Sequence, residues 1–123
     1  MNVVLWIIAG LLAVAFGAAG LMKLTQPKEK LAPKMAYVED FSAGAIKAIG
    51  AVEVLAALGL ILPAVLDIAP VLVPLAALGL VITMVGAAVV HARRGEHQAI
   101  APNVVLLVLA AVVAWGRFGP YSF

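Results

Sequence analysis

Long uninterrupted apolar stretches alternate along this chain with short polar segments. Four stretches are each long enough to cross a hydrocarbon core of about 30 Å as an α-helix, which takes about 20 residues. They cover residues 3–22, 44–63, 68–90 and 99–116. The strands of an outer-membrane barrel would instead alternate apolar and polar positions over about ten residues. We therefore predict an all-α membrane protein with a single domain, residues 1–123, folded as a four-helix transmembrane bundle.

The polar segments between these stretches predict how the helices connect. The link of residues 23–43 contains four lysines, two prolines and three acids. We predict that it is partly structured, as a short interfacial helix or a cap over one end of the bundle; a plain flexible loop is the alternative. The link of residues 63–69 is short, so the second and third helices are expected to be antiparallel neighbours.

Small residues recur at helical spacing in two of the stretches. The two sets share the spacing i, i+3, i+7, i+10 and are Gly10, Ala13, Gly17 and Gly20, then Ala76, Gly79, Thr83 and Gly86. Aligned small residues let another helix backbone come close, so we predict that these faces pack against neighbouring helices. The alternative is that alanine and glycine are simply common in membrane helices.

The composition agrees with a membrane protein and excludes several kinds of chemistry. Hydrophobic residues make up 66% of the chain and charged residues only 11%, whereas a soluble domain of this size is about half apolar. The chain contains no cysteine. Disulfides, thiol redox relays, thiolate metal sites and cysteine nucleophiles are therefore excluded.

The basic residues predict an orientation in the membrane. Seven of the eight Lys and Arg residues lie in the links 23–43 and 91–98 or at Lys47, and only Arg117 lies at the other side. The positive-inside rule then places those two links in the cytoplasm and both termini outside a plasma (inner) membrane.

Several polar and aromatic residues lie next to the spans, where lipid headgroups are found. We predict headgroup or interface contacts for a set of five: His91, Arg93, Arg94, Trp115 and Arg117. The net charge of +2 gives no case for a nucleic acid partner. His91 and His97 are separated by six positions, which is not a ligand spacing on one helix face, so no metal site is predicted.

A carboxylate inside a span is the strongest chemical signal in the chain. Glu53 lies about 13 Å from the predicted cytoplasmic end of its helix, at about 1.5 Å per residue. A charge near mid-membrane costs about 3 kcal/mol even on lenient insertion scales, so it usually has a partner or a task. Lys23 at the end of the first span is directed toward it, Thr83 lies at similar depth, and Lys47 precedes it on the same helix. We predict a buried polar site from these four residues.

Three interpretations of this polar site are open. It is a structural ion pair, or it lines a cavity that binds a small apolar ligand with a polar head, such as a quinone or a lipid, or it is a proton or ion relay. Only one acid lies deep in the spans, so a relay would need an oligomer.

Taken together, these segments resemble the DoxX-like family of small four-span membrane proteins. The resemblance covers nearly the whole chain, and its charged positions are Lys23, Glu53, His91 and Arg117. The matching segments are Gly20-Leu-Met-Lys23-Leu, Ile49-Gly50-Ala-Val-Glu53-Val-Leu-Ala-Ala-Leu-Gly59-Leu, Met84-Val-Gly-Ala87, and the Arg-Arg-Gly-Glu96 link.

The resemblance implies an architecture more than an activity. The family includes a subunit of a thiosulfate:quinone oxidoreductase, a membrane partner of secreted antioxidant enzymes, and chaperones for receptor assembly. It implies an integral membrane scaffold or assembly factor that binds protein partners, or copies of itself, through small-residue helix faces. A quinone-reactive subunit of an oxidoreductase complex is the alternative, and a small transporter is the third class.

No cofactor is predicted for the chain itself. The sequence has no ligand set for haem or iron–sulfur clusters, and it pairs no nucleophile with a base. We therefore expect the isolated chain to catalyse no reaction on its own.

Overall fold

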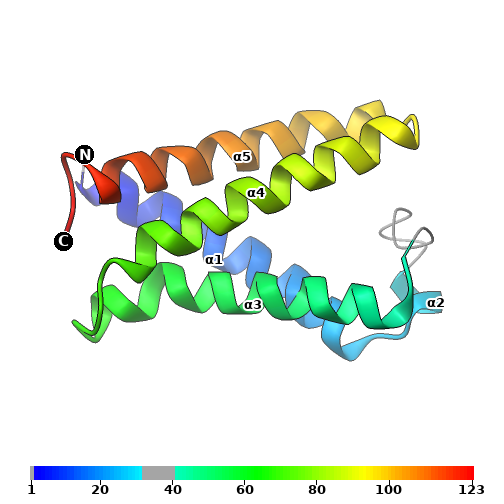
Figure 1. The fold of residues 1–123 in the computed structure, drawn as a ribbon, viewed down its shortest axis with the longest axis horizontal. Helices are drawn as coiled ribbons and strands as arrows, with labels where there is room; N and C mark the ends of the chain where they lie inside the picture. The colour runs from blue at the N-terminus through cyan, green and yellow to red at the C-terminus, as the bar shows by residue number, and fades with distance from the viewer. Residues whose placement is uncertain (1, 32–40) are drawn as a thin grey trace.

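Four long helices run antiparallel in a computed structural model that describes residues 2–31 and 41–123 (Figure 1). The elements in chain order are α1 (Asn2–Thr25), α2 (Lys28–Leu31), α3 (Ala43–Val65), α4 (Leu72–Arg93) and α5 (His97–Phe118). All helices but α2 are long and apolar enough to cross a membrane. The predicted four-helix transmembrane bundle is confirmed. Most of the predicted cap over one end lies outside the described residues; α2 is its described part.

Local signals set the ends of the helices. Ser42 caps α3, because its hydroxyl accepts a hydrogen bond from the backbone N–H of Ala45 at 3.1 Å, a typical N-terminal cap. Gly95 ends α4 with a φ of +70°, a left-handed conformation that glycine adopts without steric cost. The N–H of Glu96 then reaches back to the carbonyl of His91 at 2.9 Å. These bonds confine the link between α4 and α5 to three residues.

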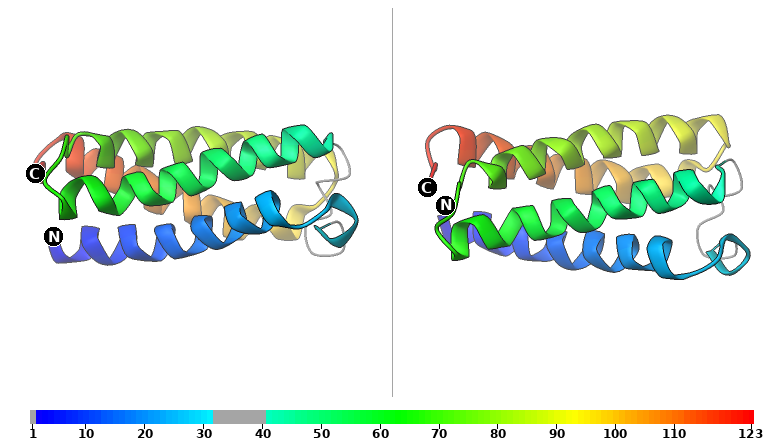
Figure 2. Two further views of the ribbon diagram at one scale, coloured as in Figure 1. Left: turned by 90° about the horizontal axis from the view of Figure 1, so that it is seen from below. Right: turned by 60° about the horizontal axis from the view of Figure 1, so that its bottom comes forward.

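The bundle consists of two helix pairs. α1 packs along α3 and α4 packs along α5, while the pairs join through α3 against α4 and, more sparsely, α1 against α5 (Figures 1 and 2). Their shared core lies toward the end where α1 begins and α5 ends; its largest fully buried side chains are Leu5, Leu12, Leu60, Leu80, Val73 and Val113. At the opposite end the two pairs diverge (Figure 1).

Two glycines bring the backbones of α1 and α3 into direct contact. A Cβ atom on Gly50 would lie 2.7 Å from the Cβ of Lys23 and 2.8 Å from the carbonyl oxygen of Gly20. A Cβ on Gly20 would lie 2.7 Å from the carbonyl oxygen of Gly50. Such contacts have no room for a methyl group, so glycine is required at both positions for this approach.

The predicted small-residue faces are used only in part. Gly10, Gly79 and Gly86 have no atom of another helix within 4 Å of the place a Cβ would take. On α1 the buried face is instead occupied largely by bulky side chains, such as Leu5, Leu12 and Phe16. The prediction was wrong for those three glycines. In most of the bundle the packed faces consist of large apolar side chains rather than of small residues.

The fold makes the orientation in the membrane testable. The start of α1 and the C-terminus lie at one end of the bundle, and the end of α1, helix α2 and the link that follows α4 lie at the other (Figure 1). Because the basic residues gather at those links, we expect Glu29 to face the cytoplasm and Ser122 to face the outside. Both residues are exposed, and no native cysteine interferes.

Single cysteines at the two positions report this orientation. In intact cells an impermeant thiol reagent should label the Ser122→Cys variant and leave the Glu29→Cys variant unlabelled until the membrane is permeabilised. Labelling of Glu29→Cys alone would reverse the assignment.

Candidate functional site

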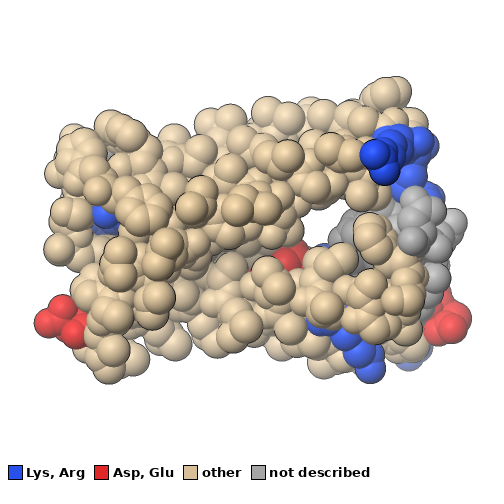
Figure 3. Space-filling view, in the orientation of Figure 1, with Lys and Arg blue, Asp and Glu red and all other residues tan. Residues whose placement is uncertain are grey.

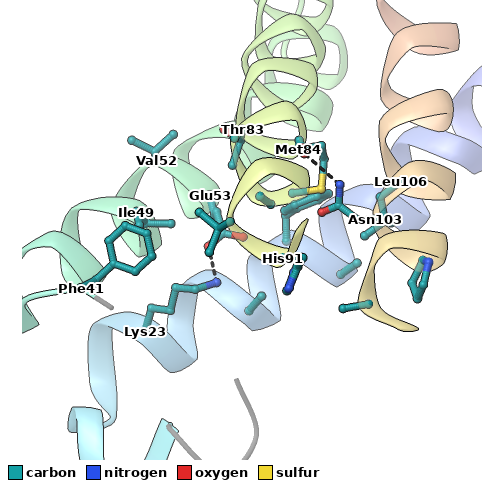
Figure 4. Close-up of a pocket in the computed structure, with 18 of the residues that line it drawn as sticks. Lys23, Phe41, Ile49, Val52, Glu53, Thr83, Met84, His91, Asn103 and Leu106 are labelled. Carbon is teal, nitrogen blue, oxygen red and sulfur yellow. Dashed lines mark hydrogen bonds and ion pairs between the residues drawn. The ribbon is translucent and has the colours of Figure 1, made fainter. Parts of the chain in front are cut away.

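A buried ion pair connects α1 to α3. Nζ of Lys23 lies 2.6 Å from Oε1 of Glu53, and the two side chains are only 3% and 5% exposed (Figure 4). The link was predicted to begin at Lys23, but α1 continues to Thr25 and holds Lys23 inside the bundle. The ammonium reaches the carboxylate because Gly20, one turn before Lys23, lies against Gly50, one turn before Glu53.

A cavity of about 760 Å³ lies beside this ion pair. It occupies the space between the helix pairs where they diverge, and most of its wall is apolar side chain. Among the residues that the structure describes, the polar ones that line it are Lys23, Glu53, Thr83, His91 and Asn103. Ligand pockets in helical bundles have this form, an apolar wall with a few convergent polar groups, and volumes of about 300–1,000 Å³.

The cavity opens on two sides of the bundle. On the side of α3 and α4, its lining includes the exposed residues Val52 and Gly86; on the side of α1 and α5, it includes the exposed residues Ala15 and Pro102. Figure 3 shows the opening on the face formed by α3 and α4. All four residues lie within membrane-spanning helices, so both openings face the bilayer.

Asn103 is a third buried polar residue of the site, after Lys23 and Glu53, and it was not among the residues predicted from the sequence. Its amide Nδ2 donates to the backbone carbonyl of Met84 at 2.8 Å and so ties α5 to α4 (Figure 4). The side chain is almost fully buried. The available signal was a carboxamide in the otherwise apolar stretch 99–116, since a polar group there needs a partner inside the bundle.

Two predicted members of the polar site are placed differently. Lys47 is exposed and is no part of the site, because six residues before Glu53 on an α-helix is a different face. Thr83 lines the cavity, but its hydroxyl donates to the carbonyl of Gly79 on its own helix at 2.9 Å. That hydrogen bond satisfies the hydroxyl within α4, as is usual for threonine in apolar helices.

The short link between α4 and α5 is a small polar cluster. Nδ1 of His91 and Oε1 of Glu96 are 3.0 Å apart, and Nε of Arg94 lies 3.2 Å from Oε2 of Glu96. The hydrogen bond with His91, with a smaller contribution from Arg94, holds the pKa of Glu96 below its usual value. Arg93 is exposed. Of these residues, His91 alone also lines the cavity.

Arg117, predicted at the headgroups, is instead enclosed by the chain itself. It is 4% exposed and donates to Oδ1 of Asn2 at 2.6 Å and to the carbonyl of Tyr121 at 2.9 Å. Its guanidinium lies 4.0 Å from the ring centroid of Phe123 and 5.8 Å from that of Trp6. Burial is tolerated because these carbonyls and ring faces replace water around the cation.

Trp115 remains on the surface near this cluster. It is 55% exposed, and its ring meets that of Tyr121 edge to face at 6.0 Å. An exposed tryptophan at the end of a spanning helix is typical of the membrane interface.

One comparison with known proteins identifies relatives of the chain. A family described as DoxX-like matches residues 7–113, a range that contains the ion pair, Asn103 and the whole cavity lining. No curated protein and no solved structure has a significant match.

Proposed function

The chain belongs to the DoxX-like family, and from that premise we propose that it binds a small amphipathic molecule, a quinone or a lipid, in the cavity beside Lys23 and Glu53. The resemblance found in the sequence is confirmed, and the protein is a multi-pass membrane protein. The observation that carries the proposal is the cavity of about 760 Å³ that opens toward the bilayer and holds a buried ion pair.

Stability alone does not explain why the bundle contains this ion pair. Two charges that leave water pay a desolvation cost that can exceed their attraction, and apolar residues of similar volume often stabilise a fold equally well. A pair that borders an open cavity, with Asn103 on another helix of the same cavity, supports a binding site for a ligand with a polar head. The apolar wall suits its hydrocarbon tail.

A role as scaffold or assembly factor is the second candidate. Gly79 and Gly86 on α4 have no atom of another helix of the chain within 4 Å of a Cβ position, so a helix of a partner, or of a second copy, has room to approach there. The two roles are compatible, because a ligand-binding subunit without its own haem or iron–sulfur ligands would serve a partner protein. We place both roles in the plasma membrane, with the termini outside.

Filling the cavity tests the ligand proposal. Ala19 lines the cavity, whereas the neighbouring Ala18 is exposed on the outer side of α1. We expect Ala19→Phe to weaken binding of decylubiquinone or of a phospholipid by more than about tenfold, about 1.4 kcal/mol, because the new ring occupies the ligand's volume. Ala18→Phe should bind as the wild type does. Binding is measured on purified protein with labelled ligand.

An equal loss of ligand binding in Ala19→Phe and Ala18→Phe would show that the loss comes from a disturbed helix α1 and not from the filled cavity. Saturable binding that survives in Ala19→Phe would contradict the proposal.

A further inference from the structure

Two hydrogen-bond acceptors in the cavity have no partner among the described residues. Oε1 of Glu53 accepts from Lys23, which leaves Oε2 without a donor. Nδ2 of Asn103 must face the carbonyl of Met84, because a carbonyl only accepts; Oδ1 of Asn103 is then the unpaired atom. Both residues are more than nine-tenths buried, at 3% and 6% exposed, and both line the cavity (Figure 4).

Among the described residues, the surroundings of these two oxygens supply no further donor. Most of the cavity wall is apolar, and the hydroxyl of Thr83 already donates to its own helix. Lys23 is engaged by Glu53 and His91 by Glu96. The acyl chains outside both openings carry no N–H or O–H group. The two oxygens face the cavity rather than being enclosed by protein. An acceptor that faces an apolar-walled space and has no donor there is unfavourable, so the site is complementary to a molecule that donates hydrogen bonds.

We propose that the cavity selects ligands whose polar head donates hydrogen bonds, such as a phenol, an alcohol or a quinol, over molecules of the same shape that only accept them. The head lies between Glu53 and Asn103, and its hydroxyl groups donate to Oε2 of Glu53 and Oδ1 of Asn103. This inference rests on the proposed ligand-binding function and specifies the chemical class of the ligand.

A matched pair of redox-inert probes tests the inference. 4-Dodecylphenol and its methyl ether, 4-dodecylanisole, share one ring and one tail, and only the phenol can donate. We expect the wild type to bind the phenol at least about tenfold more tightly than the ether, since the single hydroxyl of the phenol can pair one of the two acceptors and the ether can pair neither. The dissociation constants are measured on the purified full chain in one detergent, with the same titration for both probes.

One variant and its control assign the selectivity to Oε2 of Glu53. In Glu53→Gln the side-chain oxygen still accepts from Lys23, and an amide N–H takes the place of Oε2. The preference for the phenol should therefore fall several-fold, through tighter binding of the ether as well as weaker binding of the phenol. Thr83→Val is the control, because it removes a cavity hydroxyl that donates only to Gly79. It should leave the ratio unchanged.

The outcomes separate this inference from the function on which it rests. Equal affinity of the wild type for phenol and ether, with both displaced by Ala19→Phe, overturns the inference and leaves the binding function standing. Binding of neither probe overturns both. An unchanged ratio in Glu53→Gln overturns the assignment of Oε2.

Discussion

Replacing Lys23 alone by methionine should lower the free energy of unfolding by about 3–5 kcal/mol, because it leaves the carboxylate of Glu53 buried and unpaired. Glu53→Leu should also be strongly destabilising, since it removes the carboxylate that Nζ of Lys23 contacts at 2.6 Å inside the bundle. The two side chains are 2.6 Å apart and almost fully buried. The double variant removes both charges and should recover most of the loss, so the coupling between the two positions is expected to be large.

The measurement is a double-mutant cycle of unfolding in mixed detergent micelles, followed by circular dichroism. Lys47→Met is the matched control, because Lys47 precedes Glu53 on the same helix but is exposed; it should change stability by no more than about 0.5 kcal/mol. A double variant whose loss equals the sum of the two single losses would show that the charges do not stabilise one another.

Gly50→Ala should be the second severe change, although it adds only one methyl group. The new Cβ would lie 2.7 Å from the Cβ of Lys23 and 2.8 Å from the carbonyl oxygen of Gly20. The carbonyl belongs to the backbone, so α1 must move away from α3. Overpacking of this kind costs about 1–3 kcal/mol. Because the movement also separates Lys23 from Glu53, we expect a loss at or above the top of that range.

Gly79→Ala provides the control for this substitution. Its Cβ would have no atom of another helix within 4 Å, and alanine is the better helix former by up to about 1 kcal/mol. Stability should stay equal or rise. As a second readout, the double-mutant cycle of Lys23 and Glu53 is repeated in the Gly50→Ala variant. The coupling free energy between the two positions should be smaller there than in the wild type. Full stability of Gly50→Ala would contradict the close approach of α1 and α3.

Hydropathy alone predicts the four spans, because a bilayer requires about 20 apolar residues per helix whatever their tertiary contacts. It predicts their ends less well. Lys23 was assigned to a link on account of its charge, yet α1 extends to Thr25, since the ammonium finds a carboxylate inside the bundle. The direction in which Lys23 and Glu53 lean along their helices predicted that they would approach. The axial register that lets them meet comes from Gly20 and Gly50, and sequence spacing does not show it.

The remaining differences come from rotation about the helix axes. Lys47 was grouped with Glu53 by sequence proximity. Side chains six positions apart on an α-helix point to different sides, so the two residues lie on different faces of α3. Asn103 was passed over because a single amide has no periodic pattern; its role depends on the carbonyl of Met84, 19 residues earlier in the chain. The cavity itself has no sequence signature, because it arises from the divergence of two helix pairs.

Because the two openings of the cavity face the bilayer, a ligand must compete with lipid for the cavity. A tail that moves from the bilayer into this space leaves one hydrocarbon environment for another, so the transfer free energy that drives apolar binding from water is nearly absent. Acyl chains of neighbouring lipids are themselves competitors for the same volume. Tail length should therefore have little influence on affinity in a bilayer, and the measured affinity should change with the lipid or detergent used as the reference solvent.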